Sequence, residues 1–125
     1  MTDTTISPNS GAARFTGIGV RMGTLYISEY RAAVAYPFAT GAVILNEPPE
    51  AVQSVAIGGA SAPSAAFGPT TRMIRVQADI NCSIMVSPSP GATPVADTTQ
   101  HRLAAGQTEV LAVKPGDLIA VISNA

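Results

Sequence analysis

The most constraining feature of this sequence is an alternation of apolar and polar residues over 73–86, MIRVQADINCSIMV. The even positions, from Ile74 to Val86, are all apolar, and the odd positions from Arg75 to Ser83 are polar. Successive side chains of a β-strand point to opposite faces of its sheet. The run therefore predicts a sheet with one packed face and one face in water.

The alternating run is too long for an ordinary single strand. It would span about 45 Å, whereas a typical strand has about five or six residues. The predicted break is Asp79-Ile80-Asn81, because Asp and Asn accept turn geometry and can bond to nearby backbone. We therefore predict a hairpin with arms 72–78 and 82–87, and a single long bent strand is the alternative.

Further short strands are predicted between glycine and proline positions. They cover 24–30, 42–45, 51–57, 109–113 and 118–123, with turns at 105–107 and 114–117. The continuous apolar run LIAVIS over 118–123 predicts a strand covered on both faces. A short helix over 28–36 is an alternative for the first segment, since Tyr26, Tyr30 and Ala33 fall three or four apart.

Two segments without strand character complete the reading of the chain. Phe67 lies in the small-residue segment ASAPSAAFGPTT and is expected to plug the core. The segment SPSPGATPVADTTQ is polar and broken by prolines, so we expect a loop at an end of the sandwich.

These elements predict an all-β fold, a single β-sandwich or jelly-roll-like module with an extended N-terminal arm. The boundary is predicted at Glu47-Pro48-Pro49-Glu50, because consecutive prolines cannot donate to a strand ladder. Residues 1–50 would form the arm, with short strands, and 51–125 the sandwich module.

The low share of charged residues gives information about the partners of this chain. Only 12% of the residues are charged, against roughly a quarter in typical soluble domains. Because protein contacts are depleted in charge at their centres, we infer that other chains cover much of this surface. A compositional bias of the source is the alternative explanation.

Charge and segment patterns argue against nucleic acid and membrane partners. The net charge is −1 and the basic residues are scattered, so no basic footprint for nucleic acid is present. No stretch of about 18 apolar residues suits a membrane span, and the first residues do not resemble a secretion signal.

The sequence offers few candidate residues for catalysis or metal binding. The chain has one histidine, His101, and one cysteine, Cys82. A hydrolytic triad or a zinc site needs more such groups, and Cys82 alone cannot form an internal disulfide. The glycines in 17–23 depart from a dinucleotide-binding spacing, and Asn81-Cys82-Ser83 matches a glycosylation site only formally. We expect no enzyme activity, cofactor or metal, and an exposed His101.

The aromatic residues suggest where contacts are made. Most of them fall in the predicted arm, whose own capacity to bury them is small. The predicted interface anchors are Phe15, Tyr26, Tyr30, Tyr36 and Phe38, with Arg14, Arg21 and Arg31 as polar partners. The alternative is that the arm folds back and covers one sheet of its own chain.

Residues 54–122 resemble small β-rich structural proteins of tailed bacteriophages, through MIRVQADINCSIMVSPSPGATP followed by LAAGQTEVLAVKPGDLIAVI. The resemblance implies a strand pair with a D-x-N-C turn, a proline-containing loop and a closing hairpin. It also implies a non-enzymatic virion protein assembled in the host cytoplasm, and we expect a capsid decoration or cement protein. Such a protein would form a homo-oligomer, with a trimer favoured, and bind the major capsid protein through its sandwich and arm.

Two other functions remain open at this point. One is a structural role in the tail, neck or fibre attachment of the same virion. The other is a carbohydrate-binding or cupin-like module, although the chain has no tryptophan and few metal-ligand residues.

Overall fold

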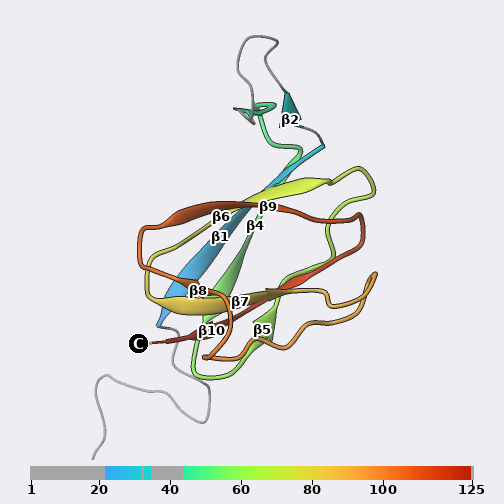
Figure 1. Ribbon diagram of the computed structural model, residues 1–125. Coiled ribbons are helices and arrows are strands. Elements are labelled where there is room, and N and C mark those ends of the chain that lie inside the picture. Colours follow the sequence, from blue (N-terminus) through green and yellow to red (C-terminus); the bar gives the residue numbers. More distant parts are fainter. Residues whose placement is uncertain (1–21, 32, 35–43, 125) are drawn as a thin grey trace, which may run out of the picture.

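The computed structural model describes residues 22–31, 33–34 and 44–124, and this part of the chain is all-β without a helix (Figure 1). The predicted fold class is therefore confirmed. The strands are β1 Gly23–Tyr30, β2 Ala33–Val34, β3 Ile44–Leu45, β4 Ala51–Ile57, β5 Ala62–Pro63, β6 Met73–Ala78, β7 Cys82–Val86, β8 Arg102–Leu103, β9 Thr108–Ala112 and β10 Ile119–Ser123.

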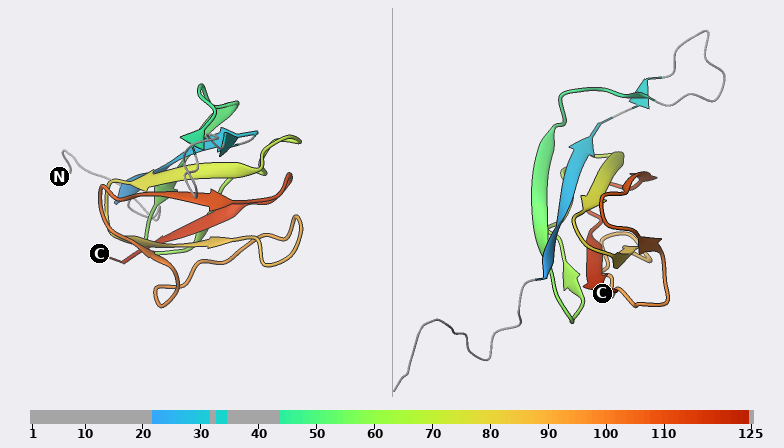
Figure 2. Two further views of the ribbon diagram at one scale, coloured as in Figure 1. Left: turned by 45° about the horizontal axis from the view of Figure 1, so that its top comes forward. Right: turned by 90° about the vertical axis from the view of Figure 1, so that its left-hand side faces the viewer.

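Two four-stranded antiparallel sheets pack face to face. Sheet I has the strand order β4-β1-β6-β9, and sheet II has the order β5-β10-β7-β8. Figure 2 shows the two layers nearly edge-on in its right-hand view. The short strands β2 and β3 pair only with each other among the described strands, and they lie outside the two layers.

The core lies between the sheets and is built from the apolar positions of each alternating strand. Phe67 joins it from the connection between β5 and β6 and is 3% exposed, as its predicted role as a plug requires. The other buried members are Leu25, Ile27, Val55, Ile57, Ile74, Val76, Ala78, Cys82, Ile84, Leu103, Val113, Ile119 and Val121. Burying a large aliphatic or aromatic side chain contributes about 1.5–3 kcal/mol, so this layer dominates stability.

The alternating run breaks at 79–81 as predicted, but the predicted hairpin is wrong. β6 pairs with β1 and β9 in sheet I, whereas β7 pairs with β10 and β8 in sheet II. The break is thus a corner at which the chain passes from one sheet to the other. The even positions face the core in both strands, so the alternation is preserved across the corner.

The closing pair of strands was also expected to form a hairpin, and it does not. The predicted turns are present, with Gly106 at φ 80° and Gly116 at φ 84°. However, β9 belongs to sheet I and β10 to sheet II, so the turn at 115–116 also connects the two layers. In β10, Ile119, Ala120 and Val121 are all fully buried, which confirms a strand covered on both faces.

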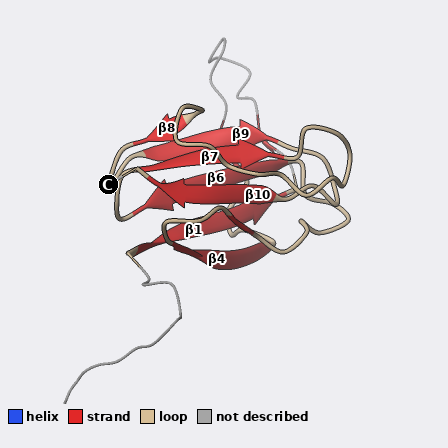
Figure 3. Ribbon diagram, turned by 90° about the horizontal axis from the view of Figure 1, so that it is seen from below, coloured by secondary structure: helices blue, strands red, loops and turns tan. Residues whose placement is uncertain are grey.

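The connection 87–101 covers the outer face of sheet II and does not stand only at the end of the sandwich (Figure 3). Ala96 is 4% exposed, and its N–H donates to Ser61 Oγ over 2.8 Å. The hydroxyl of Ser83, on the outer side of β7, donates to the carbonyl of Gln100. The small and proline residues of this segment let it lie close against the sheet.

The predicted boundary between arm and module needs correction at one place. Gly23–Tyr30, placed in the arm by the sequence, is β1, which lies between β4 and β6 in sheet I. Its alternating Leu25 and Ile27 face the core, so the segment is part of the sandwich. The predicted strand character of 24–30 is confirmed, and the alternative helix over 28–36 is not found in the described residues of that range.

Candidate functional site

The outer face of sheet I is the most unusual surface of the described chain. Unlike sheet II, it has no described connection lying across it (Figure 2). Exposed apolar side chains stand on three of its strands, with Tyr26 52%, Val52 71% and Val110 45% exposed. We call this surface the sheet I face.

Charge is nearly absent from the sheet I face. The strand registers place the side chains of Tyr26, Ser28, Val52, Ser54, Ala56, Met73, Arg75, Gln77, Thr108, Val110 and Ala112 on it. Arg75 is the one charged side chain among these strand positions. A solvent-facing sheet surface normally carries many more charges, whereas the centre of a protein contact does not.

A shallow groove of about 420 Å³ runs along the sheet I face between β1 and β4. Tyr26 and Val52 stand beside it, and Ser28 and Ser54 supply polar groups. An aromatic ring with a polar tip next to an exposed valine is the composition of a protein contact site.

Tyr30, at the end of the sheet I face, is buried by its own chain. Its hydroxyl donates to Glu47 Oε2 over 2.8 Å. Arg75 Nη1 lies 3.6 Å from the same oxygen, and the Arg75 guanidinium lies 5.9 Å from the centre of the Tyr30 ring. Burial raises the pKa of the Tyr30 phenol, and the hydrogen bond to Glu47 raises it further. Tyr30 thus links β1 to the segment before β4.

The predicted interface residues therefore have different surroundings. Tyr26 is exposed on the sheet I face, Tyr30 is buried, and Arg31 is exposed and forms an ion pair with Glu50 at 2.7 Å. The remaining predicted anchors lie outside the described residues: Arg14, Phe15, Arg21, Tyr36 and Phe38. Sequence reasoning missed Val52 and Val110, because valine in a strand is normally taken as core.

His101 is exposed at the start of β8, as expected. Its Nε2 lies 2.7 Å from Glu109 Oε1, and Gln107 donates to the other oxygen of Glu109. Both side chains of this hydrogen-bonded pair are partly in solvent, so the interaction contributes at most about 1 kcal/mol. Among the described residues, no group of three or more His, Cys, Asp or Glu is placed to hold a metal ion.

Glu29 is a buried carboxylate whose hydrogen bonds join separate segments of the fold. It is 4% exposed and faces inward at the end of β1. Its Oε1 accepts the Thr71 hydroxyl at 2.8 Å and the Gly68 N–H at 3.0 Å, and its Oε2 accepts Gln53 Nε2 at 3.1 Å. Glu29 therefore ties the connection before β6 to β1 and β4.

Cys82 is predicted to be unreactive in the folded protein. It is fully buried, and burial raises its pKa from 9.0 to about 11, with the charge of Asp79 adding to the effect. The thiolate is the reactive form, so a thiol reagent at pH 8 should label the protein only after urea unfolds it. Rapid labelling of the native protein would contradict this burial. Because the folded pKa is raised, the contribution of Cys82 to stability is complete below pH 9 and is lost as the pH rises through 11.

Comparison of the chain with protein-family models, with curated proteins and with solved structures finds no match. The part of the chain that the structure describes also contains no helix suited to crossing a membrane. The sheet I face is thus the candidate functional site on geometry and composition alone.

Proposed function

We propose that this protein is a non-enzymatic structural subunit of a phage virion, and specifically a decoration or cement protein on the capsid surface. The observation that carries the proposal is the sheet I face, a nearly uncharged surface with exposed Tyr26, Val52 and Val110. The resemblance of residues 54–122 to small phage structural proteins supplies the setting. The partners would be the major capsid protein and further copies of this chain.

A rigid sandwich suits such a role because its contact face is held in place by the core behind it. Each exposed apolar side chain of the sheet I face would contribute about 1–2 kcal/mol when covered. Among the described strands, β4 and β9 each pair on one side only, so each sheet I edge can also accept a strand from a partner. Repetition over many copies would then hold a shell together through individually weak contacts.

The proposal predicts that Val52→Lys weakens binding to capsid shells about tenfold or more, because a charge would be buried in an apolar contact. The measurement is co-sedimentation of the purified protein with emptied shells of the virus that encodes it. Val95→Lys is the matched control, since Val95 is also 71% exposed but lies on the 87–101 connection. Both variants should unfold at the temperature of the unmodified protein.

Equal binding by the two variants would show that the sheet I face is not the contact. Electron cryo-microscopy of virions carrying a tagged copy tests the location directly. Labels spread over the head would support decoration, labels at one vertex or along the tail would favour the tail or neck alternative, and absence from the virion would overturn the proposal.

A further inference from the structure

The two lateral sides of the sandwich differ, and one of them is open. On the β4 side, the chain passes directly from β4 in sheet I to β5 in sheet II, and the Ser123 N–H donates to the Gly58 carbonyl over 2.9 Å. On the opposite side, β8 pairs with β7 only at Cys82 and Ser83. Beyond Ser83, the Ile84 N–H still bonds to the His101 carbonyl over 2.9 Å, and no described strand lies beside Met85 and Val86 on this side.

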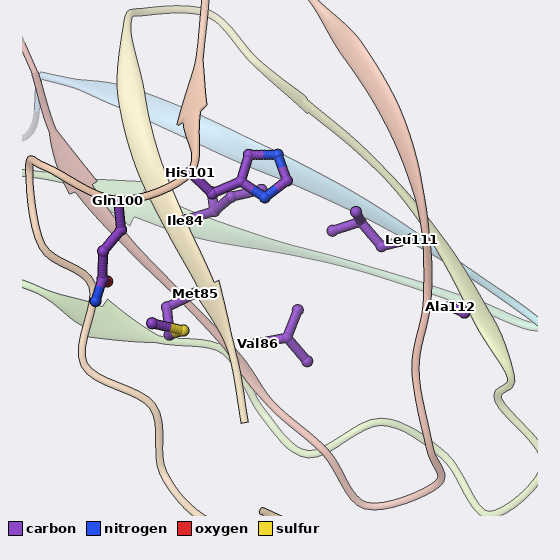
Figure 4. A pocket seen from close by; sticks show the side chains of 7 residues that line it. All are labelled: Ile84, Met85, Val86, Gln100, His101, Leu111 and Ala112. Carbon is purple, nitrogen blue, oxygen red and sulfur yellow. The ribbon is translucent and has the colours of Figure 1, made fainter. Parts of the chain in front are cut away.

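An apolar pocket of about 270 Å³ occupies the open side, between β7 and β9 (Figure 4). Ile84, Val86 and Leu111 supply its core-facing side chains, and Met85 and Ala112 complete the lining. Gln100 and His101 stand at the β8 end of the pocket. Val86 and Leu111 also pack against the core, so the pocket is an extension of the core toward solvent.

The size and lining of this pocket suit one large apolar side chain. A cavity of about 150 Å³ lined by aliphatic groups is enough to hold a benzene ring. An extended segment beside Met85 and Val86 could lengthen the β8 side of sheet II while inserting such a side chain between the sheets. The pocket and the unpaired part of β7 would then be filled by the same occupant.

Resting on the homo-oligomer of the proposed function, we infer that the occupant is the N-terminal segment of a neighbouring copy, with Phe15 in the pocket. Residues 1–21 lie outside the described part of the chain and precede Met22. Phe15 is the only aromatic residue in that stretch, and beyond its neighbours Arg14 and Thr16 lie the small residues Ala12, Ala13, Gly17 and Gly19, which permit close approach to a strand edge.

The position of Met22 indicates a neighbouring copy as the source. The Met22 N–H bonds to the Ile57 carbonyl over 2.8 Å, so the chain enters β1 next to β4, at the end of sheet I where Gly23 lies. Leu111, in the pocket, is level with Ile74 and Glu29 at the other end of β1. With about 3.3 Å per residue and 4.8 Å per strand spacing, seven residues along β1 and two strands across put Leu111 about 25 Å from Met22, along a straight line that runs within sheet I.

The reach of the chain is too short for its own Phe15. From Phe15 to Met22 it extends to at most about 25 Å. It would have to reverse direction at Met22 and pass around sheet I to reach the space between the sheets, a longer path than this straight line. The N-terminal segment that inserts and the pocket that receives it therefore lie on different sides of each copy. Such head-to-tail contacts close into a ring when the rotation between copies permits, as in a trimer.

Disulfide cross-linking between two single-cysteine additions tests the inference. One chain carries Thr16→Cys next to Phe15, and a second, longer tagged chain carries His101→Cys at the β8 end of the pocket. Under mild oxidation the mixture should give a covalent heterodimer, while Cys82 stays buried and unreactive. Adding Phe15→Ala to the first chain should reduce the yield at least fivefold, and Val95→Cys in the second chain should give no heterodimer.

The outcomes separate this inference from the proposed function. Absence of the heterodimer, an unchanged yield with Phe15→Ala, or a bond formed only within one chain that carries both cysteines would each overturn it. The effect of Val52→Lys on shell binding does not depend on this pocket, because Val52 lies on the outer face of sheet I. Shell binding that depends on Val52 but shows no cross-link would therefore leave decoration supported and exclude the exchanged segment.

Discussion

Replacing Glu29 with alanine is expected to lower the free energy of unfolding by about 3 kcal/mol. The change removes the acceptor of the Thr71 hydroxyl and the Gly68 N–H, and Thr71 is 1% exposed. A buried donor without an acceptor costs about 1–3 kcal/mol, and two donors lose their acceptor together. Urea denaturation followed by circular dichroism measures the change as a shift of the midpoint.

Glu109→Ala is the matched control for this prediction. Glu109 also accepts hydrogen bonds from two side chains, but its pair with His101 is partly in solvent. Water can replace the lost carboxylate there, so we expect a loss of less than about 1 kcal/mol. Similar losses in the two variants would mean that the connection before β6 is not held by Glu29.

The alternation of residues was a good guide to which side chains are buried and a poor guide to which strands pair. Ile74, Val76, Cys82 and Ile84 face the core as their parity requires. The same parity fits a hairpin within one sheet and a corner between two sheets, because both keep the apolar side chains on one side. The choice depends on β1 and β10, which come from distant parts of the chain to pair with β6 and β7.

In the candidate site, too, the local sequence did not determine which side chains are exposed. Tyr26 and Tyr30 lie on the same side of β1, so the local sequence predicts the same exposure for both. Their difference comes from Glu47 and Arg75, which approach Tyr30 and leave Tyr26 exposed. The sequence placed Val52 in a strand but not on either face, and its register with Ser28 puts it on the outer face. Long-range packing decides both cases.

A second large loss of stability is expected at Gly23, which packs against the corner between the sheets. Here glycine-to-alanine substitution should destabilise the fold by about 2–3 kcal/mol. A Cβ added at Gly23 would lie 2.7 Å from Ile80 Cγ1, and the Asp79 carboxylate is nearer still. Asp79 Oδ1 accepts the Thr24 N–H at 2.6 Å, so displacing that carboxylate would also weaken the bond joining the corner to β1. Chemical denaturation of Gly23→Ala measures the loss.

Gly59→Ala is the matched control for Gly23→Ala. A Cβ at Gly59 would meet nothing within 4 Å. Without a clash, alanine restricts the unfolded chain and typically stabilises by about 0.4–1 kcal/mol, so the two substitutions should have opposite signs. If both stabilised the protein, the corner would be loose enough to move away from β1. In sheet I, β1 occupies the place beside β6 that a hairpin would have given to β7. The corner 79–81 packs closely against β1 and therefore leads the chain into the other sheet.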